Sequence, residues 1–482
     1  MLSVEEIGRF MSDDESSERK RLARLGQRYY EGIHDIRNYK LYYYNADGDL
    51  VEDKTRSNIK ISHAFFTELV DQCVQYMLSG DEPIVRSDVP GLQDKLNEYF
   101  GDDFISELAE TLTDTCAGGF GYMYGYMSDN FKTKFEFAEA NGVIEVRAKD
   151  TDDHTEYVIY WYVDRIDKGR KVIKRIQVWD RNQTYYYVRV DNGQIALDES
   201  EPINPRPHVL YDEDGETYYK GLGYIPFFRL DANRKQQSHL KPIKGLIDDY
   251  DLMACGLSNN IQDMREAVWV VKGFAGDSVE ELIHNTKTKK HIAIGEEGDV
   301  DIKTIDIPYE ARSIKLELDE KNIYKFGMGF NSAQVGDGNV TNIVIKSRYA
   351  LLDMKCNKLE KRLKAFMTQL VRIVLDEINA NENTGYTLAD IDIVFEREIM
   401  TNSTDNAQIA LTEAQTKQTE VATLLNVANS LGNDAVLEAL CAVLDLDYEE
   451  VKELALEADN GGLDNATAAL NNAGNPINTE AS

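Results

Sequence analysis

The stretch from Gln237 to Asn379 constrains the fold more than any other part of the chain. It combines three helix patterns, an insert between the first two and a glycine-rich loop between the last two. Its first part, 237–264, repeats apolar residues at steps of three and four, which predicts an amphipathic helix. A second helix is expected from Glu310 to Phe326. A third runs from about Asn342 to Asn379 with the same spacing of apolar residues. The rest of the chain is expected to be arranged around these helices.

The segment between the second and third helices, 327–341, has glycine at positions 327, 329, 336 and 338. This composition predicts a mobile loop, because glycine populates many backbone conformations. The loop begins Gly-Met-Gly, and Gly-Leu-Gly occurs at 221–223. Both lack the third glycine and the strand-loop-helix frame of a dinucleotide site. The sequence also lacks GxxxxGK followed by Ser or Thr, so any ATP-driven work is expected to be done by a partner.

The remainder of the chain mixes helices and strands. Helices are predicted within 1–35, from Ser62 as N-cap to Gly80, and over 102–116. Alternating, β-branched and aromatic runs after Ala117 predict an antiparallel region. Its predicted strands cover 121–127, 143–147, 157–163, 171–179, 184–190 and 224–230. The predicted fold class is therefore α+β.

A small α/β insert of about forty residues is predicted between the first two long helices. Its expected elements are a segment at 267–271, a helix at 277–284 and strands near 291–294 and 300–305. Beyond the third long helix we expect a strand at 391–395 and helices at 405–431, 433–444 and 448–456. Residues 458–482, rich in Asn, Ala and Gly, are expected to be disordered.

The chain is strongly acidic, with 85 acidic and 53 basic residues and a formal charge of -32. Such a charge repels the phosphate backbone and argues against tight, general DNA binding. It leaves open a passage that DNA crosses without adhering. The charge is uneven, because 342–372 carries eight basic and two acidic residues, whereas 401–482 carries two and fourteen.

The chain has no run of about 18 or more apolar residues, and its first residues are polar and unlike a signal peptide. We therefore expect a soluble protein made in the cytosol, with no membrane partner. The five cysteines are far apart and form no CxxC pair, which predicts reduced, mostly buried thiols. The seven histidines form neither HExxH nor a Cys/His cluster in sequence, so no transition-metal site and no cofactor are predicted.

Acidic residues offer the one candidate for metal-dependent catalysis. Asp248, Asp249 and Asp251 in the first long helix, or Asp299 with Asp301 in the insert, could gather Mg²⁺ or Ca²⁺ in a nuclease-like centre. Neighbouring acids on a helix point in different directions, so a solvated face is favoured. Because the sequence also lacks GxSxG and any Ser-His-Asp spacing, no catalytic residue is predicted.

Two basic clusters stand out in this acidic chain. The first lies in the insert and is either a solvated tip or a surface for nucleic acid or an acidic partner. It comprises His284, Lys287, Lys289, Lys290 and His291. The second follows the third long helix and is either a solvated face or part of a contact between subunits. Its members include Lys346, Arg348, Lys355 and Lys358.

Three passages, in order, resemble the portal proteins of tailed bacteriophages, of the type found in siphophages of Gram-positive hosts. Ile61–Leu78 resembles the family's N-terminal helix. Phe227–Gly273 resembles its stem entry, with an IPF-type strand, an L-I-D-x-Y helix and a V-V-K-G strand. Leu318–Tyr349 resembles its second stem helix, tunnel loop and long wing helix. The resemblance spans roughly residues 20 to 400. Bulky Phe330 and Val335 in the loop and the acidic tail depart from it.

The resemblance implies a portal fold with a mixed α/β wing, long stem and wing helices, a small α/β clip and a helical crown. The implied division is 1–60, N-terminal helical and aromatic segment of the wing; 61–235, α+β wing; 236–264, first stem helix; 265–308, clip; 309–327, second stem helix; 328–341, tunnel loop; 342–400, long wing helix and strand; 401–457, helical crown; and 458–482, acidic tail.

The resemblance also implies a non-enzymatic function. Twelve copies would form a ring at a unique capsid vertex of the virion and enclose a channel for packaging and ejecting double-stranded DNA. Expected partners are the terminase large subunit, head-completion or adaptor proteins, scaffold and the major capsid protein. The tunnel-loop residues expected to face DNA are Phe330, Asn331, Ser332, Gln334, Val335, Asp337 and Asn339. A metal-dependent nuclease or hydrolase and a minor capsid adaptor are the alternative functions.

Overall fold

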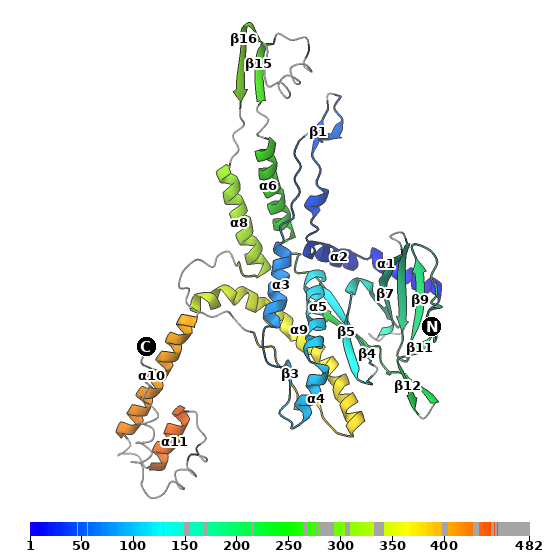
Figure 1. Cartoon of the computed structure of the whole chain (residues 1–482), viewed down its shortest axis with the longest axis vertical. Coiled ribbons are helices and arrows are strands. Elements are labelled where there is room, and N and C mark those ends of the chain that lie inside the picture. The colour runs from blue at the N-terminus through cyan, green and yellow to red at the C-terminus, as the bar shows by residue number, and fades with distance from the viewer. Residues whose placement is uncertain are drawn as a thin grey trace, which may run out of the picture. The chain divides into compact units, whose positions relative to one another are not determined.

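The computed structural model divides the chain into two compact units, which are described separately (Figure 1). The first comprises Met1–Val335 and Arg348–Ile399, and the second comprises Gly336–Ser347 and Met400–Ser482. The described residues are 1–45, 47–54, 56–128, 130–148, 155–167, 171–213, 216–263, 268–274, 278, 294–303, 309–331, 342–397, 403–427, 433–444, 448 and 451.

The largest hydrophobic core of the first unit lies among α3 (Phe65–Met77), α5 (Asp102–Gly118) and α9 (Asn342–Glu382). The short α4 (Leu92–Tyr99) joins the same core. α9 packs into it because its apolar residues recur at steps of three and four and therefore share one face. The buried residues of α9 include Leu352, Cys356, Leu359, Leu363, Phe366, Leu370, Val371 and Val374.

Antiparallel sheets flank these helices. A three-stranded sheet has the order β14-β4-β5, and a six-stranded sheet has the order β10-β9-β8-β7-β6, with β11 also paired to β9. The strands of the first are β4 (Phe120–Met127), β5 (Thr133–Ala138) and β14 (Phe227–Asp231). Those of the second are β6 (Val143–Arg147), β7 (Thr155–Asp167), β8 (Lys171–Trp179), β9 (Gln183–Val190), β10 (Ala196–Leu197) and β11 (Arg206–Pro207).

Two smaller ladders complete this region. β12 (Val209–Glu213) pairs with β13 (Glu216–Lys220), and β3 (Val85–Arg86) pairs with β17 (Asp392–Ile393), which follows α9. The β17 pairing links the end of the long helix to the segment after α3. It confirms the strand expected near 391–395, although only two residues pair.

Two helices at the N-terminus precede an extended segment, residues 31–64, which we call the strap. α1 (Val4–Ser16) begins with a capping box in which Ser3 and Glu6 satisfy each other's backbone N–H groups. α2 (Glu18–Tyr30) follows, and β1 (Tyr42–Tyr44) and β2 (Leu50–Glu52) form a hairpin. The Asn45 side chain closes its turn by accepting from the backbone N–H groups of Asp47 and Asp49.

α6 (Lys244–Asp263) and α8 (Tyr309–Gly327) pack side by side and project from the core (Figure 1). Between them in the chain, β15 (Val268–Phe274) pairs antiparallel with β16 (Ile294–Lys303). In place of the two strands expected near 291–294 and 300–305, the described residues form one strand, β16. The helix predicted at 277–284 lies outside the described residues.

Most predicted elements have observed counterparts, with two corrections. The first long helix begins at Lys244 rather than near Gln237, because Pro242 lacks a backbone N–H and disfavours helical backbone at the preceding residue. Ser62 is not the N-cap of α3, which begins at Phe65. The backbone N–H of His63 donates instead to Asp251 Oδ1 at 2.9 Å, which keeps His63 outside the helix.

In the second unit, α10 (Ser403–Val427) packs with α11 (Asn433–Leu444). They confirm the helices predicted at 405–431 and 433–444. The tail at 458–482 and nearly all of the helix predicted at 448–456 lie outside the described residues. None of the helices in the described ranges combines the length and the apolar character that crossing a membrane requires.

Candidate functional site

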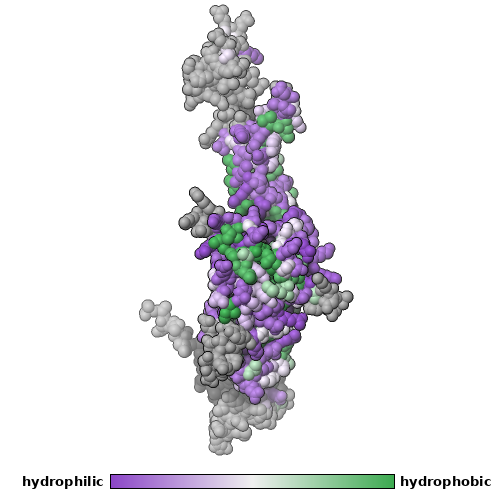
Figure 2. Space-filling model, turned by 90° about the vertical axis from the view of Figure 1, so that its right-hand side faces the viewer, coloured by the Kyte–Doolittle hydropathy of each residue, from purple (hydrophilic) through white to green (hydrophobic). Residues whose placement is uncertain are grey.

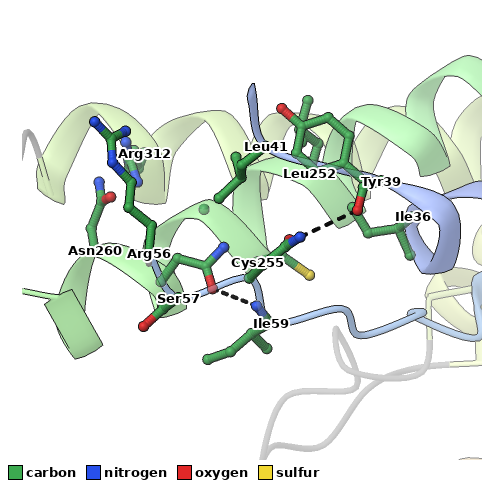
Figure 3. A pocket seen from close by; sticks show the side chains of 13 residues that line it. Ile36, Tyr39, Leu41, Arg56, Ser57, Ile59, Leu252, Cys255, Asn260 and Arg312 are labelled. Carbon is green, nitrogen blue, oxygen red and sulfur yellow. Dashed lines mark hydrogen bonds between the residues drawn. The ribbon is translucent and has the colours of Figure 1, made fainter. Parts of the chain in front are cut away.

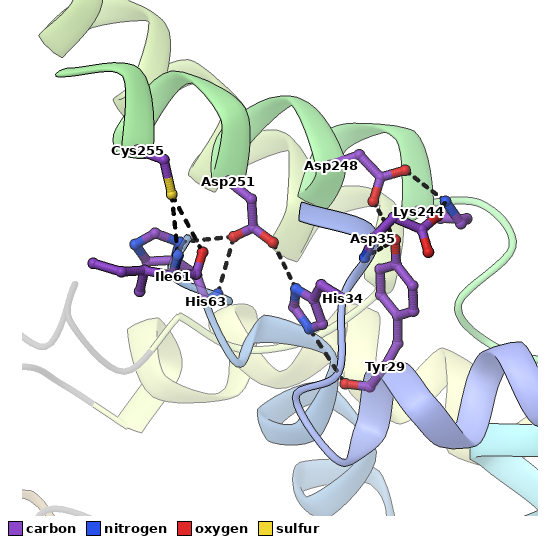
Figure 4. A network of polar contacts seen from close by, with 9 residues as sticks. All are labelled: Tyr29, His34, Asp35, Ile61, His63, Lys244, Asp248, Asp251 and Cys255. Carbon is purple, nitrogen blue, oxygen red and sulfur yellow. Dashed lines mark hydrogen bonds and ion pairs between the residues drawn. The ribbon is translucent and has the colours of Figure 1, made fainter. Parts of the chain in front are cut away.

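The strap between α2 and α3 is fastened to α6 by one buried carboxylate (Figure 4). Asp251 accepts from His34 Nδ1 at 2.6 Å and from His63 Nδ1 at 2.7 Å, and its side chain is fully buried. Burial opposes ionisation of Asp251, but the hydrogen bonds from His34 and His63 outweigh it and lower the pKa of the carboxyl. The arrangement holds the strap against α6.

A second polar group lies one helical turn earlier on α6 (Figure 4). Lys244 Nζ lies 2.6 Å from Asp248 and 2.7 Å from Asp35 of the strap, and the Tyr29 hydroxyl donates to Asp248. Burial works against protonation of Lys244, but these two carboxylates raise its pKa. Burial and the bond to Asp248 raise the pKa of Tyr29. Both polar groups therefore position α6 where it leaves the core.

The acids considered for a nuclease-like centre do not converge. Asp248 and Asp251 contact the strap, whereas Asp249 pairs with Lys315 of α8 at 2.5 Å. The expectation that these acids point in different directions is confirmed, but Asp251 is buried rather than solvated. Asp299 and Asp301 lie on β16, opposite Lys272 and Val270 of β15.

The described start of the glycine-rich loop is fixed to α3 and α9. Gln72 exchanges two hydrogen bonds with the backbone of Phe330, at 2.9 and 2.7 Å. The Phe330 ring stacks on Tyr349 at 4.8 Å. A Cβ on Gly329 would lie 2.0 Å from Leu69 Cδ2, so this glycine permits a close approach to α3. Packing thus explains glycine at position 329, and the mobility of the loop stays a prediction.

A basic cleft of about 1000 Å³ lies beside the loop base, between α9 and the turn that precedes α6. The cationic side chains on its wall are Lys241, Lys355, Lys358, Lys361 and Arg362. In an acidic chain this local excess of positive charge can attract an anionic group.

A smaller cavity of about 410 Å³ lies where the strap crosses α6 and α8 (Figure 3). In its wall, Ile59 N–H donates to Asn259 Oδ1 at 2.6 Å. Arg56 of the strap and Arg312 of α8 line its rim, and Arg312 lies beside Asn260 of α6. The cavity therefore borders the same strap contacts.

The structure describes some of the predicted site residues. On α9, Lys346 and Lys358 are exposed, and Arg348 is half-buried. Lys355 belongs to the core rather than to a solvated face, because its side chain is buried and its Nζ donates to the Gly327 carbonyl at 3.2 Å. The Asn331 amide donates to Glu320 at 2.8 Å. The predicted positions outside the described residues are Ser332, Gln334, Val335, Asp337, Asn339, His284, Lys287, Lys289, Lys290 and His291.

All five cysteines are buried and free, as predicted. The structure nevertheless brings Cys73, Cys116 and Cys356 together with His239, a cluster that sequence spacing did not indicate. Burial lowers the pKa of His239 to about 4, and the nearby charge of Lys355 adds to the effect.

The Asp251 site had a local signal, since Asp251 lies four residues after buried Ile247, on the apolar face of α6. The cysteine cluster had none.

Comparison with known proteins identifies the family. The sequence model described as "Phage portal protein, SPP1 Gp6-like" matches residues 10–461. The chain is 28% identical to the portal protein of Bacillus phage SPP1 over 342 residues, which covers 70% of this chain and 67% of that protein. It is 23% identical to the portal protein of Clostridium phage phiCD119 over 399 residues, which covers 78% of this chain and 85% of that protein. The chain therefore belongs to the SPP1 Gp6-like family of phage portal proteins.

Proposed function

We propose that twelve copies of this chain form a ring at one vertex of a phage capsid and that double-stranded DNA passes through its channel during packaging and ejection. Family membership supports a capsid-associated oligomer. Several apolar side chains of the α6–α8 pair are exposed to solvent in the single chain, and this exposure supports a ring.

These side chains lie on both helices of the pair. On α8, Ile314 is 64% exposed and Leu318 is 52% exposed, and Phe326 is exposed as well. Leu252 and Ile261 are exposed on α6. Ile314 and Leu318 are four residues apart and share one face, away from buried Ile323 and Tyr324. A helix with apolar residues on two faces needs a second partner, and in a ring the neighbouring subunit supplies it.

Further apolar surface occurs elsewhere on the first unit. Leu197 and Val163 are exposed on the six-stranded sheet, and the space-filling view of the side of the molecule that carries this sheet shows a patch of apolar residues (Figure 2). The β1–β2 hairpin exposes three consecutive tyrosines, Tyr42–Tyr44. A patch of exposed apolar residues is typical of contacts with other proteins. These surfaces would meet other subunits, scaffold or the major capsid protein.

The charge of the chain suits a channel that DNA crosses without adhering. Each phosphate neutralised by Lys or Arg strengthens binding through counterion release, so an acidic wall favours transit. The loop 328–341 would narrow this channel, with Ser332 to Asn339 toward DNA. Phe330 and Asn331 would hold the base of the loop, since both bond to the helical scaffold. The exposed cations of α9 are candidates for a contact between subunits.

The insert 265–308 would dock the packaging motor, through the terminase large subunit, and later the head-completion proteins. Its basic cluster is the proposed contact. Replacing Lys287, Lys289 and Lys290 together by Ala is expected to weaken motor-dependent DNA packaging while rings still form. Unchanged packaging would assign these lysines to a solvated tip.

Electron microscopy of the purified chain tests the ring directly. We expect closed particles with twelve-fold symmetry and a central channel, and native mass spectrometry should give the same number of subunits. Monomers or dimers under every condition of salt and concentration would contradict the proposal. They would favour an adaptor that binds a ring made by another protein.

A further inference from the structure

Four potential metal ligands from distant parts of the chain meet in the core of the first unit. Cys73 lies on α3, Cys116 on α5 and Cys356 on α9, and His239 lies in the turn before α6. The ligand atoms of Cys73, Cys116 and His239 all lie within 4.8 Å of one another. Cys356 lies outside this close group, but its Sγ is 3.8 Å from Cys73 Sγ. The three cysteines are fully buried or nearly so.

The distance between two of the sulfur atoms fits tetrahedral coordination. With Zn–S bonds of about 2.3 Å, two thiolates on a tetrahedral zinc ion lie about 3.8 Å apart. The separation of the Cys73 and Cys356 sulfur atoms matches this value. His239 is held beside the sulfurs by its own backbone, because its N–H donates to the Cys116 carbonyl at 3.0 Å.

The side-chain nitrogen Nδ1 of His239 is buried and lacks a hydrogen-bond partner among the described residues. A buried polar atom without a partner is costly, and native proteins satisfy almost all of them. A metal ion among the three sulfurs would take the lone pair of this nitrogen.

The buried side chain of Lys355 is a second indication of a metal ion. Lys355 precedes Cys356, is 8% exposed, and donates to the Gly327 carbonyl. Within the described part of the chain it has no carboxylate at ion-pair distance. Zn²⁺ with three thiolates carries one negative charge, which the Lys355 ammonium group balances. A buried site with no net charge avoids most of the cost of desolvating separate ions.

We propose that Cys73, Cys116, Cys356 and His239 bind one structural Zn²⁺ per chain. Three cysteines and one histidine are a ligand set of structural zinc sites, and thiolate ligands select zinc over magnesium or calcium. Binding releases the three thiol protons to solvent and leaves His239 neutral. The ion joins α3, α5 and α9 to the turn that begins α6, so it fixes the point where the α6–α8 pair leaves the core. This inference does not depend on the ring.

Metal analysis of the full-length chain, purified without chelator and with any histidine tag removed, tests the proposal. We expect about one zinc ion per chain by elemental mass spectrometry. Exchange with Co²⁺ should give the visible bands of a tetrahedral site and the near-ultraviolet charge-transfer band of cobalt thiolate. These spectra are read on the unmodified chain and therefore do not depend on whether a variant folds.

Variants then assign the ligands. His239→Ala and Cys356→Ser should lose most of the zinc and the cobalt thiolate band, and zinc removal should lower the thermal midpoint of the parent chain. Cys255→Ser is the matched control, since Cys255 is buried and free on α6, away from the cluster, and it should keep full zinc. Zinc far below one ion per chain, with no cobalt thiolate band, would overturn the proposal. So would a thiol count below five in denaturant without reductant, because it would show a disulfide instead.

Discussion

Asp251 on α6 accepts a hydrogen bond from His34 at 2.6 Å, and neither side chain is exposed to solvent. The two residues are 217 positions apart in the chain. The same carboxylate accepts two bonds from His63, so a single residue fastens both ends of the strap to α6. Without it, the two histidines would lose their charged acceptor inside the protein.

Asp251→Asn is expected to lower the free energy of unfolding by roughly 3 kcal/mol, because it removes the buried carboxylate that accepts three hydrogen bonds. Denaturant unfolding followed by circular dichroism measures the loss. Asp249→Asn on the same helix is the control, since Asp249 pairs with Lys315 in partial contact with solvent, and its loss should cost less than about 1 kcal/mol. Equal effects of the two substitutions would contradict this role for Asp251.

Asp114 of α5 should make stability depend on pH. Burial raises its pKa to about 6, although the Ala140 N–H and Gln27 both donate to it. Between pH values of about 4 and 6 the folded chain therefore keeps a proton that the unfolded chain has lost, so stability falls as pH rises through this window. Asp114→Asn cannot ionise and lacks this dependence.

The stability of Asp114→Asn relative to the parent chain should thus rise by up to about 3 kcal/mol between about pH 4 and pH 7. Unfolding free energies of both proteins across this range give the difference. A difference that does not change with pH would show that Asp114 ionises at its ordinary value in the folded chain.

Gly329→Ala should loosen the base of the glycine-rich loop. The new Cβ would lie 2.0 Å from Leu69 Cδ2, and Leu69 is buried with little room to move. We expect a loss of about 1–3 kcal/mol from overpacking. Gly385→Ala, which meets no atom within 4 Å, should be neutral or slightly stabilising. Thermal unfolding gives the midpoint of each variant. Equal midpoints would mean that α3 and the loop base move apart at little cost in stability.

Ile314→Asp with Leu318→Asp should prevent ring formation while each subunit stays folded. Both side chains are exposed in the single chain, so a charge there costs little until a neighbour must cover it. Native mass spectrometry should detect monomers, and circular dichroism should be unchanged. Lys321→Asp places an acid at an exposed polar position of the same helix and should leave rings intact. If the double variant still formed rings, the face of α8 that carries Ile314 and Leu318 would not be part of the interface between subunits.

The sequence by itself determined the α+β class, the long helices α8 and α9, and most strands of the large sheets. These features depend on periodicities of two or 3.6 residues, which are visible in a short window. The order of its helices and motifs was also enough to indicate the portal family, which the match over residues 10–461 then established. The predicted starts of helices were less reliable. Pro242 shifts the start of α6, and the His63–Asp251 hydrogen bond shifts the start of α3.

Only the tertiary structure decided which distant side chains meet. Gln72 and Phe330 are 258 positions apart, and Cys73 and Cys356 are 283 apart. No local spacing relates such residues, because their contact depends on how whole helices pack against one another. Packing also gave Lys355 and Asp251 buried places where helical pattern alone had allowed a solvated face. The long helices thus follow from the local spacing of apolar residues. The contacts of the strap, the loop base and the cysteine cluster depend on how these helices pack against one another.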